Sequence, residues 1–197
     1  MIATLKEVTS FIIGFLPWIL FLFLPTDGWE PLRQAVVICL GAALVFGWTA
    51  LRKGFILQWA TVGFFLFCAI AFYGLSWVWL AELMGIIANG FLAGVIWLTV
   101  LVGNPFTLQY AREELPRERW HEAGVIRTCQ VIAIFWGALL LVPTAFSVFR
   151  ALYPTALPAY FYFYLSLLCM AIGTGYTTLY KRKKREERQA MIQRQPD

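Results

Sequence analysis

Residues 103–127 read GNPFTLQYAREELPRERWHEAGVIR and form the one long polar interval between the two ends of an otherwise apolar sequence. Apolar runs flank the interval on both sides. Because charged side chains are costly in the hydrocarbon core of a bilayer, the interval predicts a loop in water. Four apolar segments precede it, and two follow it before a basic tail. This order predicts a bundle of about six transmembrane helices.

The composition excludes an ordinary soluble domain. The chain has 197 residues, of which 60% are hydrophobic and 14% charged, and its mean hydropathy is +0.70. Soluble domains have roughly 45–50% apolar and about 25% charged residues. The sequence therefore predicts an all-α, polytopic membrane protein. Its net charge of +5 belongs to loops and tail, where basic residues set orientation and meet anionic lipid, and it does not indicate nucleic-acid binding.

A helix that crosses a bilayer needs about 20 mainly apolar residues, with roughly 17 as the lower limit. The predicted spans are residues 8–24, 35–51, 55–75, 83–102, 128–146 and 160–180, in a single membrane domain (1–180) followed by a basic cytoplasmic tail (181–197). The first span is marginal in length and contains Pro17, so a re-entrant or surface-lying helix is the alternative. Pro143, Pro154 and Pro158 are expected to form the turn between the last two spans.

The basic residues predict the orientation. If the N-terminus is inside, fourteen of the sixteen lysines and arginines lie on the inner side, and only Arg33 and Arg150 lie outside. Cytoplasmic loops accumulate lysine and arginine, so both termini are expected in the cytoplasm. Removing the first span from the count moves only Lys6, so the charges do not decide whether that span crosses.

Polar residues inside the spans suggest one candidate site. These residues are Glu82, Asn89, Gln58 and Gln130. Polar groups at membrane depth tend to face the bundle interior or a water-filled path, so they could belong to a small-solute or ion transporter or channel. The alternative places Glu82 in the headgroup layer, with the other side chains bonded to their own helices.

The loop and the tail supply further candidates. One side of the loop is apolar. The candidate partner-binding residues of the loop are Pro105, Tyr110, Arg112 and Trp120. The tail residues Lys181, Arg182, Lys183, Lys184 and Arg185 are expected to bind anionic headgroups, at about 1 kcal/mol per basic residue. Gly90 and Gly94 form a small-xxx-small pair that favours close helix packing, within the chain or in a homodimer.

Catalytic patterns are missing from the sequence. His121 is the only histidine, and the cysteines at 39, 68, 129 and 169 form no Cys-x-x-Cys pair. A zinc site needs several such ligands close together. No serine is paired with a histidine at membrane depth, and no glycine-rich phosphate loop occurs. The sequence therefore predicts no catalytic residue, metal or cofactor, and a non-enzymatic protein.

Several short features recur in a known order. Phe15-Leu16-Pro17 opens the first apolar run, Arg52-Lys53 links the second and third spans, and Pro105-Phe106 follows the fourth. Leu115-Pro116 and Trp120 then precede the next span, and the chain ends on a basic tail. In this layout the chain resembles the intracellular septation protein A family of Gram-negative inner-membrane proteins. The central loop is more charged than the family pattern, and the stretch 105–112 indicates a divergent branch.

The resemblance implies a multi-pass protein of the bacterial inner membrane. It also implies a role in envelope integrity or cell division, exercised through contacts with membrane-protein partners and lipid, without a catalytic site.

Overall fold

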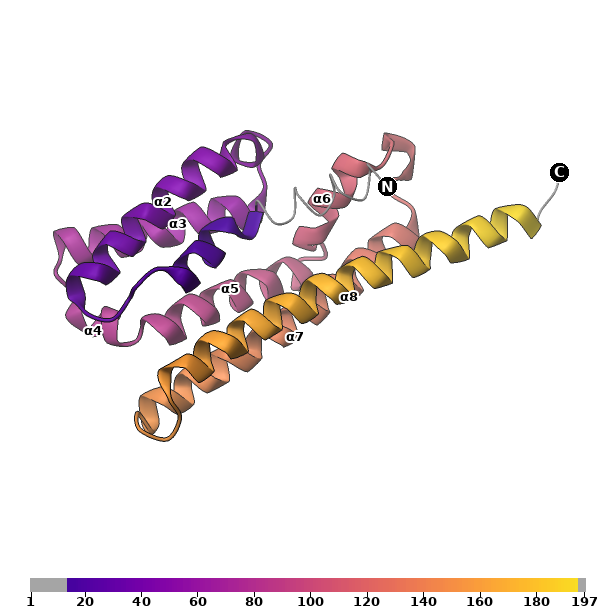
Figure 1. Cartoon of the computed structure of the whole chain (residues 1–197). Coiled ribbons are helices and arrows are strands. Elements are labelled where there is room, and N and C mark those ends of the chain that lie inside the picture. The colour runs from indigo at the N-terminus through magenta and orange to yellow at the C-terminus, as the bar shows by residue number, and fades with distance from the viewer. Residues whose placement is uncertain (1–13, 195–197) are drawn as a thin grey trace.

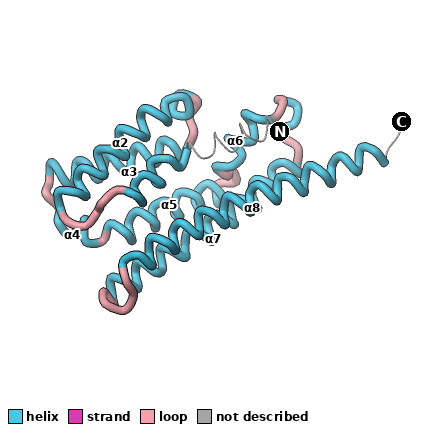
Figure 2. The backbone as a smooth tube through the Cα atoms, in the orientation of Figure 1, coloured by secondary structure: helices cyan, strands magenta, loops and turns pink. Residues whose placement is uncertain are grey.

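The computed structural model describes residues 14–194, and every regular element in this range is a helix (Figure 2). In chain order (Figure 1) these are Gly14–Phe23, α2 Trp29–Arg52, α3 Ile56–Ala69 with a π-helical turn Ile70–Gly74, α4 Val78–Glu82, α5 Met84–Leu101, α6 Phe106–Glu114, a 3-10 turn Arg117–Arg119, α7 Ala123–Leu152 and α8 Ala159–Arg194. α5, α7 and α8 lie side by side as one layer, and α2 and α3 pair as an antiparallel hairpin.

Within residues 14–194, four helical stretches are long and apolar enough to cross a membrane. They are Trp29–Arg52, Ile56–Gly74, Met84–Leu101 and Ala123–Leu152. Their outer faces carry exposed apolar side chains such as Val45, which is 71% exposed, and Leu101, which is 79% exposed. Surfaces of this kind suit contact with lipid. The prediction of an all-α protein with several apolar spans is therefore confirmed.

The first predicted span is described only in part. Residues 8–13 lie outside the described residues, and the remainder forms the ten-residue helix Gly14–Phe23. The last predicted span lies in α8, which continues without a break through the basic tail to Arg194.

α2 and α7 extend beyond the predicted spans, and one predicted turn residue is wrong. α2 begins at Trp29, directly after the N-cap residue Gly28, whose positive φ of 103° is not helical. Pro31 lies in the first turn of α2, where backbone N–H groups have no partner within the helix, so the proline costs no hydrogen bond. Pro143 lies inside α7 and does not belong to the turn. The hydroxyls of Thr144 and Ser147 donate to the Leu140 and Pro143 carbonyls in this stretch of the helix.

Glycines set the closest contacts between helices, but they are not the predicted pair. A Cβ at Gly90 would meet only Thr144 Cγ2, at an ordinary 3.7 Å, and a Cβ at Gly94 would meet nothing within 4 Å. Gly14 faces the Tyr110 side chain of α6, and three glycines of the long helices each face a large side chain of the neighbouring helix: Gly47 faces Gln58, Gly137 faces Trp97 and Gly173 faces Trp136. The last three contacts join α2 to α3, α7 to α5 and α8 to α7. The sequence spacing missed them because each glycine is paired with a side chain on another helix.

Aromatic rings link the first helix to the loop and to α7. Phe15 is buried, stacks on Trp136 with ring centroids 5.2 Å apart, and meets Phe106 of α6 edge-on at 6.2 Å. Trp136 in turn donates its Nε1–H to Thr177 Oγ1 of α8 at 2.9 Å. The central loop is therefore seated on the helical core through α6.

The basic segments meet at one end of the bundle. Lys53 in the α2–α3 hairpin forms an ion pair with Glu113 of α6. Gln109 accepts a hydrogen bond from the Ile56 N–H at 2.9 Å and donates one to the Gly54 carbonyl at 3.3 Å. The C-terminal half of α8 reaches the same end (Figure 1). Arg33, in the first turns of α2, and Arg150, in the last turn of α7, belong to the opposite end.

Candidate functional site

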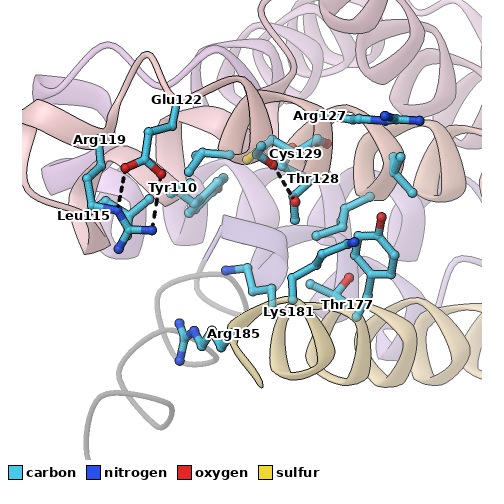
Figure 3. A pocket seen from close by; sticks show the side chains of 18 of the residues that line it. Tyr110, Leu115, Arg119, Glu122, Arg127, Thr128, Cys129, Thr177, Lys181 and Arg185 are labelled. Carbon is cyan, nitrogen blue, oxygen red and sulfur yellow. Dashed lines mark hydrogen bonds and ion pairs between the residues drawn. The ribbon is translucent and has the colours of Figure 1, made fainter. Parts of the chain in front are cut away.

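A cavity of about 730 Å³ lies between the central loop, the start of α7 and the end of the apolar part of α8 (Figure 3). Pockets that bind small molecules typically measure about 300–1,000 Å³. The loop and the tail were predicted as two separate sites. The structure makes them opposite walls of one cavity.

Hydrogen bonds hold the loop wall in place. Thr107 of α6 donates its hydroxyl to the Cys129 carbonyl of α7 at 2.7 Å. The Phe106 N–H donates to Thr99 Oγ1 at 3.2 Å, which fixes the first turn of α6 against the end of α5. Trp120 Nε1–H donates to the Leu115 carbonyl at 3.0 Å and closes the turn after α6. The wall is therefore set by packing against α5 and α7.

Charge around the cavity is predominantly positive. Five cationic side chains line it together with two carboxylates: Arg119, Arg127, Lys181, Lys184 and Arg185, with Glu122 and Glu187. Arg119 Nε lies 3.1 Å from Glu122 Oε1, and Lys184 Nζ lies 2.8 Å from Glu187 Oε2. The hydrogen bond between the second pair raises the pKa of Lys184 and lowers the pKa of Glu187, so both stay charged at neutral pH. The site therefore carries an excess of positive charge.

Tyr110 lies in the wall of the cavity and is only 5% exposed. Its ring packs edge-on against Phe55, with centroids 4.9 Å apart. Burial, and secondarily the charge of Glu113, raises the pKa of Tyr110 well above its usual range. The Tyr110 side chain therefore stays neutral and does not add a charged group to the cavity.

The other predicted loop residues have different surroundings. Pro105 is buried at the N-cap of α6. The guanidinium carbons of Arg112 and Arg117 lie 5.9 and 5.7 Å from the ring centroid of Trp120. Arg112 and Trp120 are half-buried. A partner at the outer surface would therefore meet the Arg112–Trp120 side of the loop and not Pro105 or Tyr110.

The predicted tail residues divide into two groups. Lys181, Lys184 and Arg185 line the cavity, whereas Arg182 and Lys183 do not. Positions three and four residues apart share a helix face, and this spacing is the sequence signal that could have separated the two groups. Arg119 and Arg127 of the opposite wall were not predicted as site residues. Nothing in a local pattern indicates that they face the tail.

The four polar residues of the other candidate site lie in different surroundings. Gln58 is fully buried and donates Nε2–H to the Ala43 carbonyl of α2 at 2.9 Å. Asn89 donates to the Gly85 carbonyl at 2.9 Å and to Ser147 Oγ at 3.4 Å. Glu82 is exposed at the end of α4, and Gln130 is half-buried in α7. None of the four lines the cavity.

The chemistry of the cavity is that of binding. His121 is exposed and does not line it. Among residues 14–194, no three histidine, cysteine or acidic side chains lie close enough to hold a metal ion. The four cysteines are buried and form no disulfide. Cations above hydroxyl and apolar groups suit an anion, held by charge and hydrogen bonds.

Comparison with known proteins adds no relative, because no family model, curated protein or solved structure matches this chain. The resemblance to the septation family stays a prediction.

Proposed function

We propose that this chain is a multi-pass inner-membrane protein that works by binding lipid and protein partners at its basic end, and not by covalent catalysis. The observation that carries the proposal is the convergence of the hairpin, the central loop and α8 around a cationic cavity. A cationic surface at a membrane boundary favours the leaflet that is rich in anionic lipid, which is the cytoplasmic one in the orientation predicted from charge.

The proposed topology has six spans: the four long apolar helices, the first predicted span (8–24), of which Gly14–Phe23 is the described helix, and the apolar part of α8. Two observations support it. The basic segments gather at one end, and the turns around residues 24–28 and 153–158 belong to the other. Aromatic residues at the start of α8, among them Tyr160 and Tyr164, suit an interfacial belt at that opposite end.

Labelling of single cysteines with a membrane-impermeant maleimide tests this topology. In a variant in which the four native cysteines are replaced by serine, Lys53→Cys and Arg117→Cys should react only after the cytoplasmic side is opened. Asp27→Cys and Ala156→Cys should react in intact cells, because the first lies in the turn before α2 and the second in the turn before α8. All four positions are exposed, so accessibility within the fold does not bias the comparison. Reaction of Asp27→Cys and Lys53→Cys from the same side would contradict the proposal.

The biological role that we propose follows the resemblance: maintenance of the envelope or cell division, through contacts made by the exposed side of the loop. A photo-reactive residue at Arg117 should crosslink to identified envelope or division proteins. The same group at Ala156, at the opposite end of the bundle, is the matched control. Recovery of the same proteins from both positions, or of lipid alone from Arg117, would count against this role.

The transporter or channel hypothesis has less support. Gln58 and Asn89 bond to different helices, Glu82 is exposed at the end of α4, and Gln130 is half-buried in α7. Solute flux in liposomes that depends on Glu82 would favour this hypothesis over ours.

A further inference from the structure

We propose that the cavity between the loop and α8 is a specific site for one acidic phospholipid, with the phosphate held by its cationic rim and the glyceride part lying on its apolar floor. The inference rests on the proposed membrane topology and names the ligand of the binding end. It differs from a general attraction of the tail to anionic lipid, because it assigns only some of the tail's cations to the site.

The rim supplies the charge for a phosphate. Arg119 and Arg127 come from the loop side, and Lys181, Lys184 and Arg185 come from α8 (Figure 3). Among the described residues that line the cavity, two carboxylates face these five cations: Glu122 pairs with Arg119, and Glu187 pairs with Lys184. Arginine and lysine on opposite walls can approach a phosphate from two directions, which a single cationic helix cannot do.

The floor of the cavity is apolar, unlike the cationic rim. Val125, Val131 and Ile132 of α7 line the cavity together with Leu115 of the loop. Val131 and Ile132 lie within the apolar body of α7, so the floor reaches the depth of the spans while the rim remains at the boundary. Two hydroxyl-bearing side chains, Thr128 and Thr177, lie between floor and rim. A ligand that fills this space is therefore charged at one end and apolar at the other.

The position favours lipid over a soluble phosphate compound. The cavity lies where α7 begins and where the apolar part of α8 gives way to the basic tail, which in the proposed topology is the headgroup level. Basic pockets between transmembrane helices on the cytoplasmic side bind acidic headgroups. Its volume of about 730 Å³ exceeds what a bare phosphate ion occupies and leaves room for glycerol and the first acyl carbons.

The test is native mass spectrometry of the full chain, released from nanodiscs that contain a zwitterionic lipid and phosphatidylglycerol. The cavity variant Lys181→Gln/Arg185→Gln and the control Arg182→Gln/Lys183→Gln remove the same charge from the same helix. Only the first pair lines the cavity. We expect the cavity variant to lose at least about tenfold more bound phosphatidylglycerol than the control, because the diffuse attraction of the tail falls equally in both and only the first pair lines the cavity. Equal losses in the two variants would overturn the site and leave only a diffuse attraction.

A charge-neutral variant tests the floor. Val125→Trp places a large ring in the cavity, and phosphatidylglycerol retention should fall while net charge and the thermal unfolding midpoint stay close to those of the parent. Undiminished retention would overturn the assignment. Glycerol 3-phosphate should not displace the lipid at millimolar concentration. Displacement would identify the ligand as a soluble phosphate compound and refute the lipid assignment.

Failure of the inference can be separated from failure of the proposed topology. If impermeant labelling still places Lys53 and Arg117 on one face of the membrane while the two tail variants behave alike, the lipid site is wrong and the topology stands. If Lys53 and Arg117 label from opposite faces, the cavity does not lie at a headgroup layer, and both are wrong.

Discussion

Replacing Gly173 by alanine tests the closest approach of α8 to α7. A Cβ at this position would lie 2.6 Å from Cη2 and Cζ2 of Trp136 and 2.9 Å from its Cζ3. Trp136 is fully buried, stacks on Phe15 and donates its Nε1–H to Thr177. The indole cannot move away from α8 without disturbing one of these contacts, so the overlap forces the two helices apart.

The expected cost follows from three contributions. Overpacking of a close-packed core costs about 1–3 kcal/mol. Weakening the hydrogen bond from Trp136 to Thr177 costs about 0.5–1.5 kcal/mol. Alanine is a better helix former than glycine by up to about 1 kcal/mol, which offsets part of this. The free energy of unfolding should therefore fall by about 1–3 kcal/mol in Gly173→Ala.

Gly175→Ala is the matched control, two residues further along the same helix. A Cβ there meets nothing within 4 Å, so this variant should be unchanged or more stable by up to about 1 kcal/mol. Both variants are compared with the parent by denaturant unfolding in mixed micelles, followed by tryptophan fluorescence and far-ultraviolet circular dichroism. Equal stability of the two alanine variants would refute the packing of Trp136 against Gly173.

Three further predictions concern single side chains. Burial raises the pKa of Tyr110 in the folded state above the ordinary value near 10. The neutral Tyr110 side chain therefore contributes fully to stability below about pH 10, and this contribution is lost as the pH rises further. In Tyr110→Phe the unfolding midpoint should fall less steeply between about pH 9 and 11, and an unchanged slope would contradict this. Thr107→Val removes the hydrogen bond to the Cys129 carbonyl and should lower the free energy of unfolding by about 1 kcal/mol in a denaturant titration, whereas no change would show that α6 does not depend on this bond. Gln58→Leu removes a bond to the Ala43 carbonyl together with a buried Oε1 that has no hydrogen-bond partner, so stability should stay within about 1 kcal/mol of the parent; a larger loss would point to a hydrated role for the amide.

Much of the fold could be predicted because each span is a local property of the chain. A run of apolar residues as long as a bilayer is thick predicts a helix whatever its neighbours are. Pro143 was assigned to the turn between the last two spans, but it lies inside α7, which continues to Leu152.

The candidate site could be predicted only in pieces. The tail cations and Tyr110 were chosen from the sequence, but the sequence did not indicate that Lys181 and Arg119 line the same cavity. The polar residues within the spans were grouped by their similar depth, and Gln58 and Asn89 instead bond to different helices. Equal depth in a bilayer specifies one coordinate of a residue and leaves its direction around the helix axis open.

The sequence by itself determined the class of protein, the apolar helices and the excess of basic residues on one side, because hydrophobicity and charge act on each segment separately. Only the tertiary structure decided which glycine packs against which tryptophan. It also decided that the central loop and the tail enclose one cavity. Those features depend on how helices distant in the chain rotate and cross until large side chains fit against small ones, and such fitting is a property of pairs of helices.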